Sequence, residues 1–489
     1  MNPAPNPHRP VDMPFLEERT RAPAFPTDGV WFNVADPIRL EDCRGRVVLL
    51  DFWTYCCINC LHVLPDLRFL EAQYGDRLLV IGIHSPKFTQ EKKDEQVKLA
   101  IQRHDIRHPV LHDASMHLWQ AYGIHAWPTL VLLDHQGRVA FATSGEGQRS
   151  ILASAIDRLL SEAKENRTRE FSFPEARPET GPHLCFPTKL AWGWDCLWIA
   201  DTGHHQLVSV DRSGNETGRW GSGLAGFSDG MRDSACFNEP RGLTVNRQTI
   251  WVADTGNHAL RILDLPGRTV RTILGDGVQA RDRQRPGDSH PLPSGTRLNS
   301  PWDLTIRNQV LYLAMAGSHQ IWSYDPGHGS GGVLAGTGLE ALVDGSYEEA
   351  AFAQPSGLGD GAHTRLYVAD SESSAIRCLE MERREVTTLV GHGLFDFGDR
   401  NGGSRTARLQ HPLAVTEVGT ELWIADSYNS KIKILDLEKG KIRSLPLDES
   451  LNEPEGILAT PWGIFVADTN HHRVLHVDPE RGSACLFYE

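Results

Sequence analysis

The chain from about residue 184 to residue 489 consists of six copies of one sequence pattern. Each copy has a short apolar run, a polar turn, and then a run in which apolar and polar residues alternate, as in residues 250–264 (IWVADTGNHALRILD). Such runs are typical of β-strands that pair around a turn. A single small sheet cannot bury both of its faces, whereas a closed ring of tandem sheets can. The pattern therefore predicts an all-β six-bladed β-propeller over residues 184–489.

Two positions of the repeat attract interest as possible ligand sites. The first ends the apolar run, at spacings of 42 to 61 residues, and holds Asp201, Asp254, Met315, Asp370, Asp426 and Asp468. The second lies four residues later and holds His205, His258, His319, Ser374, Ser430 and His472. Equivalent positions on different blades are rotated around a ring and do not converge, so we expect the histidines to hydrogen-bond backbone groups instead of binding a metal. The aspartates are expected to accept backbone N–H groups in the turn.

The repeats resemble NHL repeats, a family named after an Asn-His-Leu turn, and the segment Asn257-His258-Ala259-Leu260 carries that signature best. No paired acids, nucleophile–base set or phosphate-binding loop stands out in this part of the sequence. We therefore expect the propeller to bind a protein partner on one of its faces. A propeller enzyme such as a lactonase is a weaker alternative, because it would need metal-binding acids that converge at the centre of the ring.

Three of the nine cysteines fall within five residues, at Cys56, Cys57 and Cys60. The pair Cys57-Ile58-Asn59-Cys60 lies between an apolar strand, residues 47–52, and an amphipathic helix. A cysteine at the first position of a helix faces unsatisfied N–H groups, which favour thiolate over thiol. The second cysteine lies one turn deeper and can attack a mixed disulfide formed at the first. This arrangement is what dithiol–disulfide exchange requires.

Residues 27–163 resemble the thioredoxin family, with an insertion near residues 84–112 that resembles the TlpA-like branch. The resemblance implies an α/β thioredoxin-like domain in which Cys57 is the attacking thiolate and Cys60 the resolving thiol. It also implies that the buried acid Asp51 helps to move the proton of the resolving thiol, and that Pro128 is a cis-proline facing the cysteines. Supporting positions around this site are Trp53, Trp127 and Thr129, which match the family, and Cys56 and Asn59, which depart from it.

The cysteine cluster leaves alternatives open. This chain has Cys56 where thioredoxins have tryptophan, and Ile58-Asn59 where they have Gly-Pro, so the direction of exchange is open. Cys56 is either an inert apolar residue or a third redox partner. A zinc site would need two further ligands, and the sequence has no second Cys-x-x-Cys pair. The domain could also be a vestigial thioredoxin fold that serves only as a docking platform.

Composition and charge narrow the partners and the compartment. The net charge is −14, concentrated in the repeats, which disfavours binding to nucleic-acid phosphates. No stretch approaches the roughly 18 apolar residues of a membrane-spanning helix. Residues 1–26 are rich in proline and are expected to form a flexible tail without a signal peptide. Residues 164–183 are expected to be a linker. A cytoplasmic protein without membrane contact is the default expectation.

Taken over nearly its whole length after residue 27, the chain resembles the family of NHL-repeat-containing protein 2 and its bacterial relatives, in which a thioredoxin-like domain precedes an NHL propeller. We therefore expect a cytoplasmic thiol–disulfide oxidoreductase that contributes to cell redox homeostasis, with the propeller recruiting a protein substrate or partner. Its only redox group would be the redox-active disulfide Cys57–Cys60, with no other cofactor and no metal. The alternative is a non-catalytic interaction scaffold.

Overall fold

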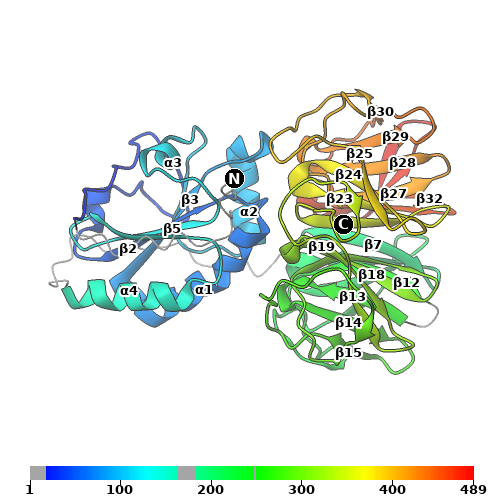
Figure 1. The fold of residues 1–489 in the computed structure, drawn as a ribbon, viewed down its shortest axis with the longest axis horizontal. Coiled ribbons are helices and arrows are strands. Elements are labelled where there is room, and N and C mark those ends of the chain that lie inside the picture. The colour runs from blue at the N-terminus through cyan, green and yellow to red at the C-terminus, as the bar shows by residue number, and fades with distance from the viewer. Residues whose placement is uncertain (1–17, 163–182, 247–248) are drawn as a thin grey trace. The chain divides into compact units, whose positions relative to one another are not determined.

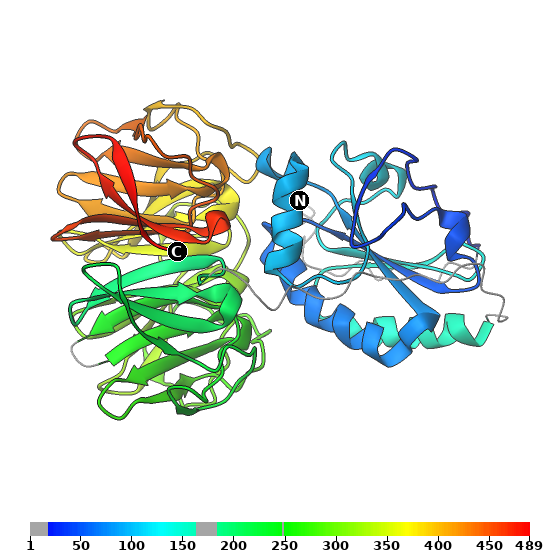
Figure 2. The ribbon, with the colours of Figure 1, turned by 180° about the vertical axis from the view of Figure 1, so that it is seen from behind.

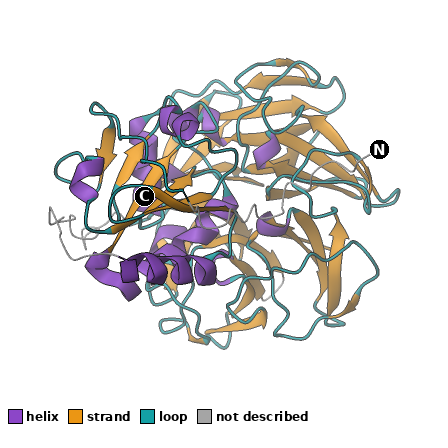
Figure 3. Cartoon of the chain, turned by 60° about the vertical axis from the view of Figure 1, so that its left-hand side comes forward, coloured by secondary structure: helices purple, strands orange, loops and turns teal. Residues whose placement is uncertain are grey.

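A computed structural model describes residues 18–162, 183–246 and 249–489. The chain divides into two compact units, Met1–Glu179 and Thr180–Glu489. The long helices belong to the first unit, and the second unit is built of strands joined by loops and short helical turns (Figure 3). The predicted linker at 164–183 and residues 1–17 of the predicted tail fall almost wholly outside the described residues.

The first unit is built around one six-stranded sheet with the order β1-β4-β3-β2-β5-β6 (Figure 1). Strand β2 runs parallel to β3 and antiparallel to β5. The central strands β2 and β3 are mostly apolar and are buried along their whole length, as expected for strands covered on both faces. The strands are β1 (Val30–Phe32), β2 (Val47–Trp53), β3 (Leu78–His84), β4 (Val110–His112), β5 (Thr129–Leu133) and β6 (Val139–Ser144).

Helices cover both faces of this sheet. Helices α1 and α4 pack together on one face, and α3 lies over the other (Figure 1). The helices are α1 (Ile58–Tyr74), α2 (Asp94–Arg103), α3 (His117–Ala121) and α4 (Arg149–Glu162), with 3₁₀ turns η1 (Leu40–Cys43), η2 (Gly75–Arg77) and η3 (Gln90–Lys92). The amphipathic helix expected after the cysteine pair is therefore confirmed as α1, and the TlpA-like insertion contains η3 and α2.

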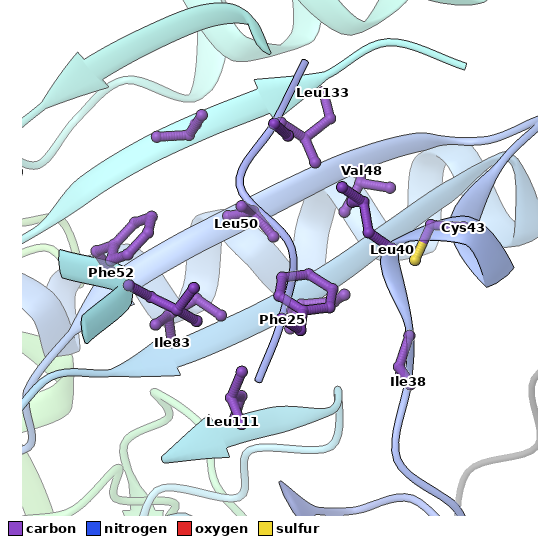
Figure 4. Close-up of a cluster of buried hydrophobic side chains, with 14 of the residues drawn as sticks. Phe25, Ile38, Leu40, Cys43, Val48, Leu50, Phe52, Ile83, Leu111 and Leu133 are labelled. Atoms are coloured by element: carbon purple, nitrogen blue, oxygen red, sulfur yellow. The ribbon is translucent and has the colours of Figure 1, made fainter. Parts of the chain in front are cut away.

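Side chains alternate between the two faces of β2. Val48, Leu50 and Phe52 belong to a buried cluster on the α3 face (Figure 4). Val47, Leu49, Asp51 and Trp53 consequently point toward α1, and so do Val80, Gly82 and His84 of β3. The face beneath the cysteine-bearing helix thus carries polar side chains near the ends of both strands.

The predicted tail extends too far. Ala22 and Phe25 are buried in the cluster on the α3 face, and Figure 4 draws Phe25 among the side chains of this cluster. The backbone N–H of Ala22 donates to Gly137 O at 3.1 Å. Residues 18–26 therefore belong to the folded unit. Proline-rich composition suggested a mobile segment, but the two apolar side chains and the backbone bonds fix this stretch in place.

The second unit is a six-bladed propeller, as predicted, and each blade comes from one continuous stretch of chain. Blade 1 contains β7 (Pro187–Gly193), β8 (Cys196–Asp201), β9 (Gln206–Asp211) and β10 (Glu216–Trp220); blade 2 contains β12 (Pro240–Asn246), β13 (Thr249–Asp254), β14 (Ala259–Asp264) and β15 (Thr269–Leu274); blade 3 contains β17 (Pro301–Arg307), β18 (Val310–Met315), β19 (Gln320–Asp325) and β20 (Ser330–Ala335).

The last three blades repeat this plan. Blade 4 contains β22 (Pro355–Asp360), β23 (Arg365–Asp370), β24 (Ala375–Glu380) and β25 (Glu385–Val390); blade 5 contains β27 (Ala414–Val418), β28 (Glu421–Asp426), β29 (Lys431–Asp436) and β30 (Lys441–Ser444); blade 6 contains β31 (Gly456–Thr460), β32 (Gly463–Asp468), β33 (Arg473–Asp478) and β34 (Ser483–Tyr488). Blades 2 to 5 gain a fifth outer strand from the loop that precedes them: β11 (Gly230–Met231), β16 (His290–Pro291), β21 (Gly345–Ser346) and β26 (Gly402–Gly403).

Neighbouring blades are joined by the repeated turn residues. His205, His258 and His319 each accept a backbone N–H of the next blade at 3.0 Å through Nδ1. Ser374 and Ser430 do the same through their hydroxyl groups. His472 accepts the N–H of Phe186 and so links blade 6 back to blade 1, which lies beside it (Figure 2). The expectation that these residues bond backbone groups is confirmed.

The anchor aspartates have a different partner from the one expected. Asp254 accepts the N–H of Asn238, sixteen residues earlier, in the loop before the inner strand. The same bond is made with the same separation by Asp201, Asp426 and Asp468, and with a separation of seventeen residues by Asp370. The turn satisfies its own N–H groups through backbone bonds such as His258 N–H to Thr255 O, so the carboxylate serves the neighbouring loop.

The inner strands carry paired charges near the centre of the ring. Arg241 of blade 2 contacts Glu455 of blade 6 at 3.2 Å, and Lys189 of blade 1 lies 3.6 Å from Asp303 of blade 3. These pairs join blades that are not neighbours, and all four side chains are buried. Each acid is thus matched by a base, which differs from the converging acids that a metal-dependent propeller enzyme would need.

Candidate functional site

The cysteine pair lies where β2 passes into α1. Cys57 is the residue before the first turn of α1, in extended conformation, and its side chain is partly exposed. Cys60 lies within the first turn and is buried, with its N–H donating to Cys57 O at 3.0 Å. Burial and the neighbouring Cys57 sulfur raise the pKa of the Cys60 thiol well above its usual value. Both cysteines are free thiols, so one thiol is accessible and its partner is held protonated behind it.

Asp51 lies two residues before the end of β2, beneath α1. Its carboxyl group is completely buried, and neither oxygen has a hydrogen-bond partner among the described residues. Burial raises the pKa of Asp51 to about 8, because a carboxylate loses its hydration there. Asp51 in turn contributes to the raised pKa of Cys60. The carboxyl group can therefore exchange a proton near neutral pH, close to the buried thiol.

Pro128 lies at the same end of the sheet. The Trp127–Pro128 peptide bond is cis, and the pairing of Thr129 with Phe52 places Pro128 opposite Trp53. The loop is held by Trp127 Nε1–H, which donates to Ser85 O at 2.9 Å, and by Gly145 N–H, which donates to Pro128 O at 2.9 Å. The hydroxyl of Thr129 bonds Ala126 O at 2.7 Å.

The remaining supporting residues have distinct surroundings. Trp53 is buried, and its ring meets the ring of His84 edge-on, with centroids 5.1 Å apart. Asn59 is partly exposed on the first turn of α1, beside the accessible thiol. Cys56 is buried, and its Sγ lies 3.9 Å from Thr54 Oγ1. Its burial keeps Cys56 from direct contact with a protein disulfide, as it does for Cys60, so both alternatives for Cys56 stay open.

Sequence reasoning missed Glu91, which fixes the segment leading to the cysteines. Its buried carboxylate accepts hydrogen bonds from Thr54 Oγ1 at 2.6 Å and from the N–H of Cys56 at 3.0 Å. The N–H groups of Lys87 and Phe88 donate to its other oxygen. Glu91 belongs to a charged stretch (QEKKDEQ) that is typical of a solvated surface, so its composition gave no signal of this role.

A second missed contact joins α1 to the loop after β6. His62 Nδ1 contacts the carboxylate of Glu146, next to Gly145, which bonds Pro128. The His62 side chain is nearly buried, whereas Glu146 is partly exposed. This contact therefore ties the cysteine helix to the loop that supports the cis-proline. Within residues 18–162, 183–246 and 249–489, no cluster of three or more His, Cys, Asp or Glu side chains could hold a metal ion.

Residues 45–139 match the family described as Thioredoxin-like, and residues 237–263 match the NHL repeat. The chain is 36% identical to NHL repeat-containing protein 2 of Bos taurus, over an alignment that covers 96% of this chain and 72% of that protein. The chain belongs to the NHL repeat-containing protein 2 family. The segment that matches the Thioredoxin-like family contains Asp51, Cys57, Cys60 and Pro128.

Other relatives match the whole chain or only its first unit. The chain is 38% identical to Protein SUPPRESSOR OF QUENCHING 1, chloroplastic, of Arabidopsis thaliana, over 96% of this chain and 48% of that protein. It therefore spans about half the length of this relative. Thiol-disulfide oxidoreductase YkuV of Bacillus subtilis is 23% identical and matches over its full length and 30% of this chain. No helix in the described parts of the chain is long and apolar enough to cross a membrane.

Proposed function

We propose that this protein is a thiol–disulfide oxidoreductase that acts through Cys57 and Cys60. The observation that carries the proposal is the accessible thiol of Cys57 at the start of α1, with the buried thiol of Cys60 one turn deeper and the carboxyl group of Asp51 beneath it. The relative named a thiol-disulfide oxidoreductase, YkuV, aligns with this unit and supports the same chemistry.

The reaction has two exchange steps. The Cys57 thiolate attacks one sulfur of a substrate disulfide; the substrate S–S bond breaks, a Cys57–substrate disulfide forms, and the first substrate thiolate leaves. Cys60 then loses its proton to Asp51 and attacks the Cys57 sulfur, which breaks the Cys57–substrate disulfide and releases the second substrate sulfur as a thiolate. The substrate gains two electrons, and the protein is left with a Cys57–Cys60 disulfide. In the reverse direction, the same residues oxidise a substrate dithiol.

Trapping of the first exchange product tests this proposal. Cys60→Ser should accumulate a dithiothreitol-sensitive adduct with a disulfide-bonded test protein such as insulin, and the wild type should reduce insulin catalytically with dithiothreitol as the electron source. The matched control is Cys57→Ser/Cys60→Ser, which keeps the partly or fully exposed Cys196, Cys236 and Cys485. Equal adduct formation by the control would assign the reactivity to those surface thiols and refute the proposal.

We further propose that the propeller binds the protein substrate or a protein partner, and that the chain works in the cytoplasm. The alternative is a scaffold without redox chemistry, and the double variant distinguishes it from an oxidoreductase. A scaffold carrying Cys57→Ser/Cys60→Ser keeps its partner binding and its cellular role, whereas an oxidoreductase keeps binding but loses turnover. One relative is named chloroplastic, so fractionation of cells of the source organism is the direct test of the compartment.

A further inference from the structure

Near Gly82, four buried side chains each have at least one polar atom that lacks a hydrogen-bond partner among the described residues. Within the described residues, no group hydrogen-bonds to either oxygen of Asp51, to Trp53 Nε1, to the ring nitrogens of His84 or to His108 Nε2. All four side chains are buried. Buried polar atoms almost always have a partner, either in the protein or in ordered water, because leaving one unpaired costs about 1–3 kcal/mol. A cluster of them therefore calls for an explanation.

Gly82 lies at the centre of this cluster. It pairs with Asp51 across the parallel β2–β3 register, and its missing side chain would point toward α1. A Cβ at this position would lie 3.0 Å from Trp53 Nε1, 3.2 Å from Val110 Cγ2 and 3.5 Å from His108 Nε2. The surroundings of Gly82 thus include an N–H donor, a ring nitrogen, a methyl group and, on the adjacent strand, a carboxyl group. A buried water needs two to four polar partners.

His108 connects this space to the surface. Its Nδ1 lies 3.4 Å from Glu71 Oε1 and its Nε2 faces Gly82; with the proton on Nδ1, toward the carboxylate, Nε2 is the acceptor on the Gly82 side. Asn33 fixes the backbone of this loop by donating to Ile106 O and His108 O at 2.7 and 3.0 Å. The Glu71 side chain is 31% exposed and lines a surface pocket of about 410 Å³ together with Arg68, Arg107 and His108.

We propose that ordered water beside Gly82 links Asp51 to His108 and Glu71, and that this chain of groups carries the proton of Cys60 between the buried site and the surface pocket. The proposal rests on the proposed thiol–disulfide exchange. His108 does not touch the sulfur atoms, so it is a positioning residue that acts through Asp51. His84 lies on the far side of Trp53, where its ring meets that of His112, and is not on the route.

Each transfer balances. When Cys60 attacks the Cys57–substrate disulfide, its proton moves to the carboxylate of Asp51. The Asp51 carboxyl group returns the proton to the water, which protonates His108 Nε2 as His108 gives its Nδ1 proton to Glu71. Glu71 then releases the proton to solvent in the pocket. The titratable groups near Asp51 and His108 from α1 and its N-cap are Cys57, Cys60 and Glu71, and Arg68, Asp105 and Arg107 line the pocket beside His108.

The test separates the two exchange steps, with glutathione disulfide as the probe. Rapid acid quenching followed by intact-mass measurement distinguishes the Cys57–glutathione adduct from the closed Cys57–Cys60 disulfide. His108→Gln should leave adduct formation unchanged and slow closure at least about tenfold, since a positioned acid–base group contributes about 10²–10⁴. Added imidazole should restore part of the closure rate in His108→Gln, which a purely structural role would not produce.

Two further variants keep the test decisive if His108→Gln folds poorly. Gly82→Ala fills the water space, and Glu71→Gln alters only a partly exposed group; both should slow closure selectively. The matched control is Asp105→Asn, which lines the same pocket but contacts Arg107 instead of His108. If His108→Gln, Gly82→Ala and Glu71→Gln all form the Cys57–Cys60 disulfide at the wild-type rate, the proton route is refuted and the proposed function is not affected. Failure of the wild type to form the adduct would overturn the proposed function and the route with it.

Discussion

Asp51 shows how one residue can serve chemistry at the expense of stability. Its carboxyl group is completely buried without a hydrogen-bond partner among the described residues, which raises its pKa to about 8. Such a group would not persist for packing alone, since an apolar side chain of the same size avoids the cost of desolvation. A carboxyl that titrates near neutrality next to a buried thiol is suited to exchanging protons with it.

Replacing Asp51 by Asn should change how stability depends on pH. The native carboxyl holds its proton up to about pH 8, whereas an unfolded one releases it near pH 4, so the native state binds more protons between these values. Stability contributed by Asp51 is therefore full below about pH 4 and is lost as pH rises through 8, on the order of 5 kcal/mol in total. Asn does not titrate, so the stability of Asp51→Asn should not fall with rising pH in this way.

The measurement is hydrogen exchange of β2 amides, corrected for intrinsic rates, in wild type and Asp51→Asn at pH 5 and pH 8. The difference between the two proteins should grow with pH in favour of Asp51→Asn. A difference that is the same at both pH values would mean that the buried carboxyl does not titrate in this range.

At the residue scale, the sequence pointed to the residues of the proposed site and not to the residues that support them. Cys57, Cys60, Asp51 and Pro128 stand at fixed offsets from a strand, a helix start and a second strand, so local patterns and a family resemblance identify them. Glu91 and His108 could not be predicted in this way. Their roles depend on which backbone N–H groups and which glycine they meet in three dimensions, and adjacent sequence does not encode those contacts.

At the scale of elements, blades 2, 4 and 5 share a buried ion pair that blade 3 replaces by apolar residues. In blade 2, Arg261 lies 2.7 Å from Asp254 and 2.9 Å from Asp229, so it ties the turn to the preceding loop. Blade 4 repeats this arrangement with Arg377, and blade 5 with Lys433. In blade 3 the two equivalent positions hold Met315 and Trp322, which are buried in one hydrophobic cluster. The acid and the base are exchanged together for apolar residues.

Removing one member of such an ion pair should lower the stability of the blade more than replacing both members. Arg261→Met leaves Asp254 buried without its cation and should destabilise blade 2 by about 3–5 kcal/mol. Asp254→Asn added to Arg261→Met should recover at least about 1 kcal/mol, because Asn is neutral and still accepts the N–H of Asn238. Hydrogen exchange of β14 amides measures both effects, and the exposed Arg271→Met is the matched control. A double variant less stable than Arg261→Met alone would refute the coupling.

The strand pattern of the propeller was predictable because its period-two alternation and its turns are local. The partners of the anchor aspartates were not, since each bond crosses sixteen or seventeen residues to a loop without a distinctive composition. The length of the tail was misjudged for a related reason. The burial of Ala22 and Phe25 depends on a sheet face formed by residues far along the chain, such as Leu133.

At the scale of the whole propeller, no blade is built from strands of both ends of the propeller sequence, since blades 1 and 6 each come from one continuous stretch. Blades 6 and 1 are joined by the same polar bonds that join other neighbours, including Thr469 Oγ1–H to Pro187 O at 2.8 Å. Two additional contacts reinforce this junction. Tyr488 of β34 hydrogen-bonds Glu216 of β10, and the rings of Trp192 and Trp462 lie 4.6 Å apart. No peptide connection holds these two blades together, so side chains must do so.

Loss of one bond at this junction should therefore have wider effects than loss of the same bond elsewhere. Thr469→Val removes the bond to Pro187, and Thr255→Val removes the equivalent bond to Pro301, where the chain itself keeps the blades adjacent. Each substitution removes one hydrogen bond, which contributes about 1 kcal/mol to stability. In Thr469→Val, we expect hydrogen exchange to rise together in β7 and in β31–β34, because either end of the ring can then fray as a unit.

In Thr255→Val, the increase should stay at the β12–β17 side of blades 2 and 3. Tyr488→Phe combined with Thr469→Val should extend the fraying to β10, since the contact with Glu216 is then also lost. Equal and local responses in Thr469→Val and Thr255→Val would contradict this expectation. That result would mean that packing between the inner strands is enough to hold blades 6 and 1 together, as it is for blades that the chain connects.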